Sequence, residues 1–397
     1  MSKHVVIQKD SNVLISSKVV DFLSPDLTYY PYDKNIKLKI KLNDYVYKFQ
    51  NIFDNGDIPI FSTISGTFIG VSQVINESAK KMPCVVIEND FKEKTAHKTG
   101  VKKYINNYSK EEFINILKKC GITENNTLIG NMFIDDFNNL IVNALDVEAY
   151  VATELFTINN YYFEIFECID AIHDIFAFNK CFILINNKEN EIITNLINSV
   201  GTYPYITIKP VEEVYNYLFN KAINDEYNFK NPLFLKSTTL FSIYKALKRS
   251  NKNDYKYITI SGNAVENPIV LNVKIGSRIN SVLKDMIKFN TNDYICVANG
   301  LVHGYKVDCN FLVITNELNS LIINKKEKHI ETDCISCGKC YKVCPYNVDP
   351  KYVMDHNNKF TKLKKMYQSK CKGCNLCSYV CPARINLRKY LKGGKGE

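Results

Sequence analysis

The chain of 397 residues contains no tryptophan and only 16 glycines, whereas glycine makes up roughly 7% of an average protein. Scarce glycine argues against a phosphate-binding loop, because such loops use glycine to let the backbone approach a phosphate and turn its N–H groups inward. No apolar run approaches the length needed to cross a bilayer. Any contact with a membrane is therefore expected to be peripheral.

The six histidines show no paired spacing with carboxylates. They give no support to a catalytic metal site or to a nucleophile triad. The chain also has no recognised nucleic-acid module and no base-stacking aromatics beside its basic region, so no nucleic-acid partner is expected. No secretory signal opens the chain, which predicts a reducing, cytoplasmic setting without disulfides.

What the chain does have is a cysteine pattern that occurs twice near its C-terminus. Each copy reads Cys-x2-Cys-x2-Cys-x3-Cys-Pro, over residues 334–345 and 371–382. Three cysteines spaced in this way wrap one tight turn around three irons of a [4Fe–4S] cluster, whereas the fourth, followed by proline, normally ligates the other cluster. The repeat therefore predicts two [4Fe–4S] clusters and, with them, electron transfer.

The spacing also predicts which cysteines share a cluster. One cluster takes Cys334, Cys337, Cys340 and Cys381, and the second takes Cys371, Cys374, Cys377 and Cys344. The alternative is a pair of structural zinc sites. Such sites usually have two separated Cys-x2-Cys pairs around one tetrahedral ion. The motif here has three closely spaced cysteines followed by a Cys-Pro pair, and it occurs twice, so it does not match a zinc site.

The remaining six cysteines are scattered along the chain, mostly inside apolar runs. Their expected state is a buried thiol, which agrees with a reducing compartment. They are Cys84, Cys120, Cys168, Cys181, Cys296 and Cys309.

The net charge of +10 is concentrated in the region of the cysteine repeat. Residues 325–397 contain 17 Lys and Arg against 6 Asp and Glu, a net +11, so residues 1–324 sum to −1. A basic electron-transfer domain suits an acidic redox partner, because opposite charges steer the encounter. The alternative is a solvated face that compensates for the negative charge of the clusters.

Hydrophobic patterning predicts different structures in the N-terminal and middle regions. Residues 1 to about 95 predict short strands, with turns at 55–57 and 65–66. Helix and strand signals then alternate between 105 and 230, as in an α/β layer. Within that layer Ser109 begins a helix with a capping pattern. The runs 140–143 and 181–185 are predicted as buried strands.

The rest of the chain predicts a strand-rich unit and then helices. We expect a helix over 232–250, strands over 257–260 and 270–273, a helix at about 278–288, and a buried strand at 311–314. A charged hinge at 325–328 leads to the cysteine repeat. The 26 residues between Cys344 and Cys371 favour helix.

With this order of elements, the chain resembles the RnfC family over nearly its whole length. Members of that family are a component of the Rnf electron-transport complex. Residues 43–50, Asn-Asp-Tyr-Val-Tyr-Lys-Phe-Gln, and 62–67, Ser-Thr-Ile-Ser-Gly-Thr, look like that family's barrel-sandwich module, which is built like a lipoyl domain. Residues 258–268, Ile-Thr-Ile-Ser-Gly-Asn-Ala-Val-Glu-Asn-Pro, look like its β-grasp ligand-binding unit. The tail 377–387, Cys-Ser-Tyr-Val-Cys-Pro-Ala-Arg-Ile-Asn-Leu, matches most closely.

The resemblance implies a multidomain α+β fold of four units. These are a barrel-sandwich β module over 1–95, an α/β domain like the flavin subunit of complex I over 105–250, a β-grasp (SLBB-like) unit over 251–324, and a helical two-[4Fe–4S] ferredoxin domain over 325–397.

In that family the middle domain is expected to bind FMN and NADH, but here the sequence departs from the pattern. The family's Gly-x-Gly-Gly-x-Gly-Phe-Pro-Thr loop should lie between Gly121 and Asn143, where residues 121–134 have neither the glycine cluster nor Phe-Pro. Asn143, Asp146 and Glu148 match the family's acidic segment in part and are the candidates for flavin binding. The alternative is that they are surface polar groups at the end of a strand.

Two further positions differ from the family pattern. The family's tyrosine-proline-glycine turn is missing around residues 215–217. His303 stands where the family has a Gly-Pro-Met-Met-Gly turn, and it is expected to be structural.

The leading hypothesis is an RnfC-like electron carrier that relays single electrons through two clusters to or from a partner oxidoreductase, without oxidising NADH itself. The partner would be a membrane Rnf-type complex or a soluble reductase, and the protein would be cytoplasmic or peripheral at the inner face of the membrane. A second hypothesis is an FMN-dependent NADH:acceptor oxidoreductase with a diverged nucleotide loop, which predicts bound flavin. A third is a scaffold whose clusters are only structural.

Overall fold

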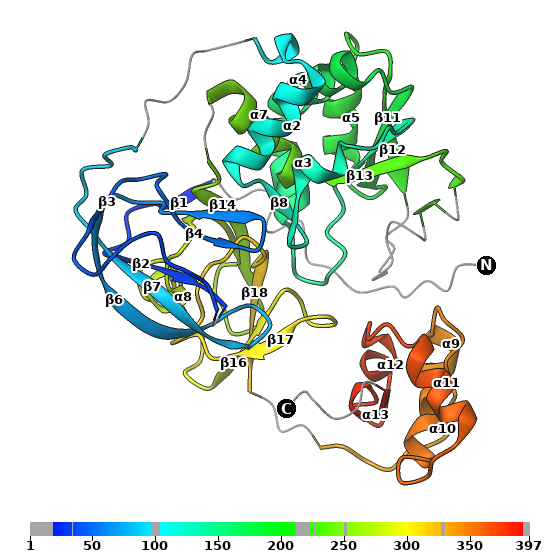
Figure 1. Cartoon of the computed structure of the whole chain (residues 1–397). Helices are drawn as coiled ribbons and strands as arrows, with labels where there is room; N and C mark the ends of the chain where they lie inside the picture. The colour runs from blue at the N-terminus through cyan, green and yellow to red at the C-terminus, as the bar shows by residue number, and fades with distance from the viewer. Residues whose placement is uncertain are drawn as a thin grey trace.

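The computed structural model describes residues 19–33, 35–96, 104–211, 223–224, 227–249, 252–326 and 330–391. This part of the chain contains three sheets of four or more strands, two two-stranded sheets and helices of up to 24 residues (Figure 1). Residues 215–217, where the family's turn is missing from the sequence, and part of the predicted hinge at 325–328 lie outside the described residues.

The N-terminal sheet is antiparallel, in the strand order β2-β7-β6-β3, and a separate hairpin joins β4 to β5. Gly56 turns this hairpin with φ of 63°, as the sequence predicts for residues 55–57. At Gly66 a β-carbon would lie 1.7 Å from the carbonyl oxygen of Glu88, so only glycine fits there. The strands are β2 (Leu27–Pro31), β3 (Tyr45–Val46), β4 (Asn51–Asn55), β5 (Ile58–Phe61), β6 (Gly66–Ile75) and β7 (Lys81–Asn89).

The middle region is a parallel sheet in the order β12-β11-β10-β13, covered by helices. Two predicted strands are confirmed as β10 and β11. Its elements are η1 (Ile105–Asn107), α2 (Lys110–Cys120), β8 (Thr123–Glu124), β9 (Thr127–Leu128), α3 (Ile129–Met132), β10 (Asn139–Asn143), α4 (Thr153–Phe176), β11 (Lys180–Asn186), α5 (Asn190–Ser199), β12 (Ile206–Val211), β13 (Pro232–Lys236) and α7 (Ser237–Arg249).

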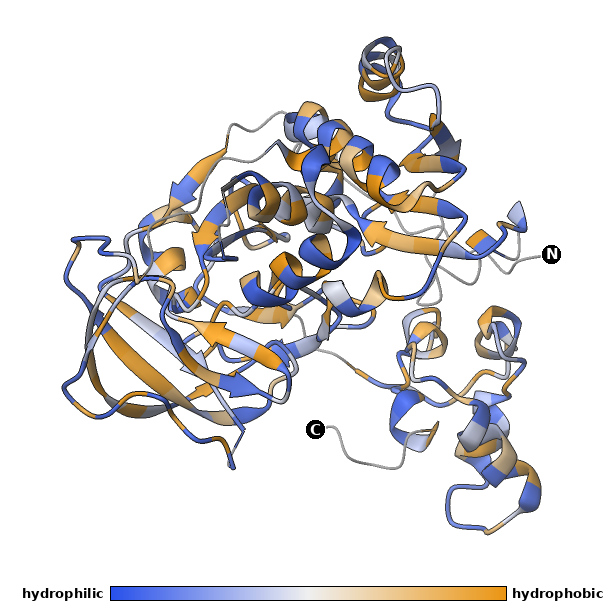
Figure 2. Cartoon of the chain, turned by 45° about the horizontal axis from the view of Figure 1, so that its top comes forward, coloured by the Kyte–Doolittle hydropathy of each residue, from blue (hydrophilic) through white to orange (hydrophobic). Residues whose placement is uncertain are grey.

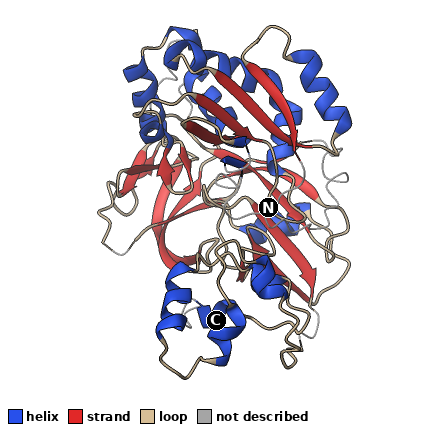
Figure 3. Ribbon diagram, turned by 90° about the vertical axis from the view of Figure 1, so that its right-hand side faces the viewer, coloured by secondary structure: helices blue, strands red, loops and turns tan. Residues whose placement is uncertain are grey.

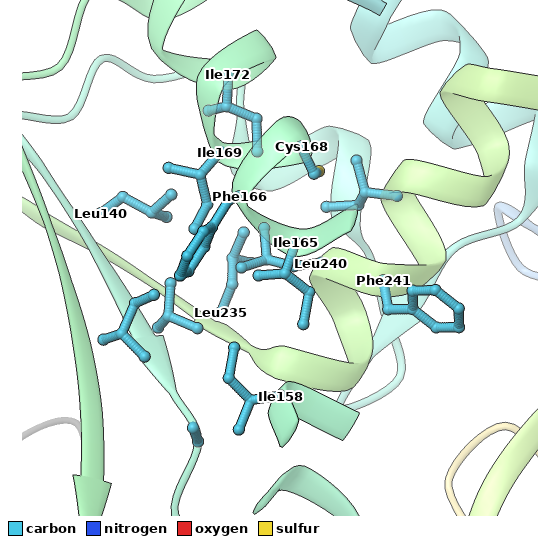
Figure 4. Close-up of a cluster of buried hydrophobic side chains, with 14 of the residues drawn as sticks. Leu140, Ile158, Ile165, Phe166, Cys168, Ile169, Ile172, Leu235, Leu240 and Phe241 are labelled. Atoms are coloured by element: carbon cyan, nitrogen blue, oxygen red, sulfur yellow. The ribbon is translucent and has the colours of Figure 1, made fainter. Parts of the chain in front are cut away.

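The core of this region lies between the parallel sheet and helices α4 and α7. Figure 4 shows Ile165, Phe166 and Ile169 of α4 directed towards Leu140 and Leu235 of the sheet. All five side chains are buried. The helices carry hydrophobic residues on one side and hydrophilic residues on the other (Figure 2), as expected for helices that cover a sheet.

Helix α2 shows how local sequence fixes an element. The Oγ of Ser109 accepts a hydrogen bond from the backbone N–H of Glu112 at 3.2 Å, and the Glu112 carboxylate accepts from the backbone N–H of Ser109 at 2.9 Å. This reciprocal pair satisfies two amides at the start of the helix, and it confirms the predicted capping box.

The predicted helix over 232–250 is wrong in its first turn. Residues Pro232–Lys236 form strand β13, which pairs in parallel with β10, and α7 begins only at Ser237. A proline suits the first residue of an edge strand, because the missing N–H is not needed there. Pairing across the sheet therefore overrides the local helical signal.

A third sheet has the order β1-β15-β14-β18-β16-β17. Its edge strand β1 precedes all strands of the N-terminal sheet in sequence and pairs with β15. The predicted strands at 257–260 and 270–273 and the helix at about 278–288 are confirmed. The elements are β1 (Val20–Phe22), β14 (Tyr255–Ser261), β15 (Ile269–Lys274), α8 (Ile279–Met286), β16 (Tyr294–Ala298), β17 (Tyr305–Val307) and β18 (Ser320–Lys325).

Two predictions about this sheet are wrong. Residues 311–314 form no strand. Leu312 makes an isolated bridge to Ile75 in β6, and Val313 makes one to Arg278 just before α8. This segment therefore contacts neighbouring elements without adding a strand to the third sheet. The predicted buried thiols Cys296 and Cys309 are joined in a disulfide. The chain folds back from β16 through β17 and brings their Cα atoms to 6.6 Å, which sequence spacing does not reveal.

The C-terminal region is a small helical domain, seen at the lower right of Figure 1. The predicted helical spacer between the cysteine motifs is confirmed as α10 and α11. Buried Val348, Val353 and Leu387 form part of the domain's core. The helices are α9 (Lys339–Val343), α10 (Pro350–Asp355), α11 (Lys362–Lys370), α12 (Leu376–Tyr379) and α13 (Arg388–Leu391).

Candidate iron–sulfur centres

The eight motif cysteines lie around two separate cavities in the helical domain. The first cavity is lined by Cys334, Cys337, Cys340 and Cys381. The second is lined by Cys344, Cys371, Cys374 and Cys377. Each cavity therefore receives three cysteines from one motif and the fourth from the other, as the predicted crossed ligation requires.

The ligand loops owe their shape to residues in the left-handed region. Ser336 and Gly338 in the first loop have φ of 54° and 71°, and Gly373 and Asn375 in the second have φ of 75° and 60°. These turns direct backbone N–H groups towards the sulfurs. The N–H of Ser336 lies 3.4 Å from the Sγ of Cys334.

The same arrangement occurs at the second cavity. The N–H of Gly373 lies 3.4 Å from the Sγ of Cys371, and that of Val348 lies 3.3 Å from the Sγ of Cys344. Hydrogen bonds to ligand sulfurs are one of the factors that set cluster potential. The donor set of four thiols and the surrounding N–H groups thus fit a [4Fe–4S] cluster in each cavity.

The two sets of cysteines differ in exposure. Cys334 and Cys337 are exposed, whereas Cys377 is buried. Burial, together with the neighbouring Cys374 and Cys371, raises the pKa of the Cys377 thiol to about 12. Because the ligand must be a thiolate, bound iron has to supply the compensating positive charge.

The second cavity lies on the side of the helical domain that contacts the rest of the protein. Leu376 and Val343 pack against Val302 and Ala149. The side-chain amide of Asn375 donates to the carbonyl oxygen of Val302 at 2.9 Å. Figure 3 shows the helical domain beneath the sheets.

A second contact holds the same interface. The guanidinium of Arg388 donates to the hydroxyl of Tyr305 in β17 at 3.1 Å. The second cavity is therefore the inner one, and the first lies on the outer side of the domain.

The three flavin candidates each bind backbone amides of this chain. The Oδ1 of Asn143 accepts from the N–H of Leu145 at 2.9 Å. The Asp146 carboxylate accepts from the N–H groups of Glu154 and Leu155, at 3.0 and 3.1 Å, in the first turn of α4.

Glu148 holds the turn that follows β16. Its carboxylate accepts from the N–H of Val302 at 3.1 Å and from the N–H of His303 at 3.0 Å, and it lies 2.7 Å from the His303 Nδ1. His303 thus has the structural contacts expected from the sequence.

Residues 121–134, where a flavin phosphate loop was expected, form the β8–β9 hairpin and helix α3. A β-carbon on Gly130 would lie 2.7 Å from the Lys118 side chain, so this glycine allows α3 to pack on α2 and makes no cradle. The Glu124 carboxylate accepts from the N–H of Lys236 at 3.2 Å and from the Thr239 hydroxyl, and so lies at the start of α7. With glycine only at positions 121 and 130, this segment has no glycine cluster that would let its backbone approach a phosphate.

Two family profiles match the chain. Residues 5–92 match the RnfC barrel sandwich hybrid domain, and residues 324–387 match a 4Fe-4S dicluster domain. The RnfC-type component of the ion-translocating oxidoreductase complex of Buchnera aphidicola (subsp. Acyrthosiphon pisum) is 25% identical over 362 residues, which cover 83% of this chain and 75% of that protein. The chain belongs to the RnfC-like family.

The corresponding component of the Na(+)-translocating ferredoxin:NAD(+) oxidoreductase complex of Acetobacterium woodii is 26% identical over 107 residues, covering 26% of this RnfC-like chain and 24% of that protein. A chain from the crystal structure of an NAD+-reducing [NiFe]-hydrogenase in the air-oxidized state superimposes with a TM-score of 0.52 at 8% identity. That match covers 73% of this chain and 61% of the hydrogenase chain, and it shows a shared fold.

Together, the dicluster domain and the family make this RnfC-like chain an iron–sulfur electron-transfer protein. Within the part of the chain that the structure describes, no helix is both long and apolar enough to span a membrane.

Proposed function

We propose that this RnfC-like protein relays single electrons through two [4Fe–4S] clusters with crossed ligands. The supporting observation is that each of the two cavities is lined by three cysteines of one motif and one of the other. The outer cluster would be held by Cys334, Cys337, Cys340 and Cys381, and the inner cluster by Cys344, Cys371, Cys374 and Cys377.

Each bound cluster would accept and release one electron at a time. The protein's own residues hold the thiolates, direct N–H groups towards the sulfurs and limit access of water. The inner site is the better shielded, since its Cys377 is buried. Backbone donors at Gly373 and Val348 stabilise negative charge on the sulfurs there.

The outer cluster is the proposed point of exchange with a redox partner. Cys334 and Cys337 are exposed, and Ile335 between them is 67% exposed. Electron transfer partners approach most closely where cluster ligands reach the surface. The excess of Lys and Arg in residues 325–397 favours a partner with an acidic surface.

We propose that the partner belongs to a membrane complex of the kind named for the curated relatives, an ion-translocating oxidoreductase complex. The protein would then be cytoplasmic and peripheral at the inner face of the membrane. A soluble reductase is the alternative partner. The units over 1–95, 105–250 and 251–324 would serve in docking, with 325–397 carrying the clusters.

We also propose that the chain does not oxidise NADH itself, because residues 121–134 lack the glycine cluster of the family's phosphate loop and form the β8–β9 hairpin and helix α3 instead. The competing function is an FMN-dependent NADH:acceptor oxidoreductase subunit. The fold shared with a chain of an NAD+-reducing hydrogenase supports that alternative. Bound flavin in the purified protein would establish it.

The crossed ligation is tested by a pair of matched variants, Cys344→Ser and Cys381→Ser. Cys344→Ser should damage the cluster of Cys371, Cys374 and Cys377, whereas Cys381→Ser should damage that of Cys334, Cys337 and Cys340. Electron paramagnetic resonance of the dithionite-reduced proteins would follow the two cluster signals, and the signal lost should differ between the variants. The crossed pairing would be refuted if each variant instead lost the cluster held by the first three cysteines of its own motif.

A further inference from the structure

Arg388 lies beside the inner cysteine cavity and is held at both ends. It lines that cavity together with the four cysteines of the inner set. Its backbone N–H donates to the Oγ of Ser378, the residue after Cys377, at 3.1 Å. Its guanidinium donates to the hydroxyl of Tyr305 in β17 at 3.1 Å, and the guanidinium carbon lies 5.2 Å from the centre of the Tyr305 ring. The side chain is therefore fixed between the cluster domain and the rest of the protein.

The two cavities differ in the charged side chains on their walls. Arg388 and Lys372 line the inner cavity, and among the described residues no Asp or Glu does. Glu148 lies across the interface, and its carboxylate is bound to N–H groups of the turn after β16. The outer cavity is lined by Lys351, which is paired with Asp355. The inner cavity therefore has the larger excess of positive charge on its wall.

This charge matters because a cluster becomes more negative when it accepts an electron. A fixed cation stabilises the reduced form and raises the reduction potential, whereas burial disfavours the added charge and lowers the potential. The inner site is the better shielded one, since Cys377 is buried whereas Cys334 and Cys337 are exposed. Burial alone would therefore oppose the transfer of an electron to the inner cluster. Arginine stays protonated at physiological pH, so its charge offsets that burial permanently.

We propose that Arg388, positioned by Tyr305, raises the reduction potential of the inner [4Fe–4S] cluster. Arg388 supplies no ligand to iron and acts only through its charge on the cavity wall. The proposal rests on the electron relay proposed above, because it concerns one of the two clusters of that relay. It assigns to Arg388 a role in electron transfer in addition to its contact with β17.

Potentiometric titration of the anaerobically purified full-length protein, followed by electron paramagnetic resonance, measures the potential of each cluster. The Cys344→Ser and Cys381→Ser variants identify which signal belongs to the inner cluster. Arg388→Gln removes the charge and retains a donor for the Tyr305 hydroxyl. At a fixed ambient potential this variant should lower the ratio of reduced to oxidised inner cluster about tenfold, a shift of about 59 mV for one electron. The outer cluster should shift much less.

Lys389→Gln is the matched control, because it removes the same charge at the next position. Lys389 lines neither cavity and pairs with Glu331 at 3.6 Å. The inner cluster of this control should titrate as in the unaltered protein, and Arg388→Lys, which restores the charge, should recover most of the lost potential. A merely structural role of Arg388 would lower iron content or stability and leave the potential unchanged. Equal inner potentials in Arg388→Gln and Lys389→Gln would overturn the proposal.

A second variant covers the case in which Arg388→Gln does not retain the inner cluster. Tyr305→Phe leaves the cluster domain unaltered and removes only the hydroxyl that holds the guanidinium. The contacts of Asn375, Val343 and Leu376 still hold the domain in place. We expect the ratio of reduced to oxidised inner cluster to fall about threefold in this variant. An unchanged ratio would contradict the proposal.

Iron analysis of the same samples separates this proposal from the relay itself. About eight irons per chain with equal inner potentials in all variants would contradict only the role of Arg388. An unaltered protein that contains no iron after anaerobic purification would contradict the relay, and this proposal with it.

Discussion

The side chain of Glu148 joins two regions of the molecule that are distant in sequence. Glu148 is 7% exposed, and its carboxylate accepts hydrogen bonds from the N–H groups of Val302 and His303. Gly300 leaves room for it, since a β-carbon there would lie 2.3 Å from the Glu148 side chain. The turn that Glu148 holds includes Val302, which packs against the inner cysteine site. This carboxylate therefore positions the surface on which the cluster domain rests.

Replacing Glu148 by leucine should lower the free energy of unfolding by about 1.5 to 3 kcal/mol, because two buried N–H groups lose a charged acceptor. Urea unfolding followed by circular dichroism would measure the change. The control Glu191→Leu, at an exposed position in α5, should change stability by less than about 0.5 kcal/mol. Equal effects of the two substitutions would show that Glu148 has no such structural role.

Helix α11 is the element that presents positive charge beside the cluster sites. It has no buried residue, and three lysines, Lys362, Lys364 and Lys365, lie in its first half. Phe360, just before the helix, is 84% exposed. A mostly solvated basic helix contributes little to the core, so its charge is available to steer an acidic partner.

Reversing the charge of Lys362, Lys364 and Lys365 to glutamate should slow electron exchange with an acidic redox partner several-fold at low salt. The difference should shrink at high salt, because screening weakens long-range steering. Stopped-flow measurement of partner reduction at two ionic strengths checks this. The control triple Lys37, Lys41 and Lys119, which is exposed on other elements, carries the same change in net charge. If the two triple variants reduce the partner at identical rates, α11 is not part of the docking surface.

Local sequence predicted elements well where the determining contacts are local. The capping box of α2, for example, lies within four residues. The crossed cysteine sets follow from motif spacing and stay a prediction, which the lining of the two cavities supports. The strand at Pro232–Lys236 and the Cys296–Cys309 disulfide were missed, because both depend on chain segments that meet only in the folded sheet.

The candidate sites show the same division. Glu148 was identified as a polar residue after a strand, but its contact with residues 302 and 303 lies across 154 positions or more.

At the scale of the whole molecule, the contacts between the cluster domain and the rest of the protein are partly polar and partly apolar. They include the hydrogen bonds of Asn375 and Arg388 and the apolar packing of Val343 and Leu376. Small, partly polar interfaces between domains permit relative motion. The docked arrangement places the inner site against the body and leaves the outer site for a partner.

Removing both polar contacts with Asn375→Gly and Arg388→Ala should weaken the attachment of the cluster domain to the rest of the protein without loss of its clusters. Glycine at 375 retains the left-handed backbone that the ligand loop requires. Limited proteolysis should then cut the connection after β18 several times faster, at unchanged iron content. The control Gln368→Ala removes a bond to the Tyr390 carbonyl inside the cluster domain and should leave the cleavage rate unaltered. Equal cleavage of all three proteins would show that these contacts do not hold the domain.

The central claim, an iron–sulfur relay without its own NADH oxidation, is tested most directly by one anaerobic preparation. Iron, sulfide and flavin are quantified on the same sample, and the visible absorbance is followed after addition of NADH and then of dithionite. We predict about eight irons per chain, no flavin, no bleaching by NADH and reversible bleaching by dithionite. One FMN per chain with bleaching by NADH would contradict the account and make this protein an NADH-oxidising subunit.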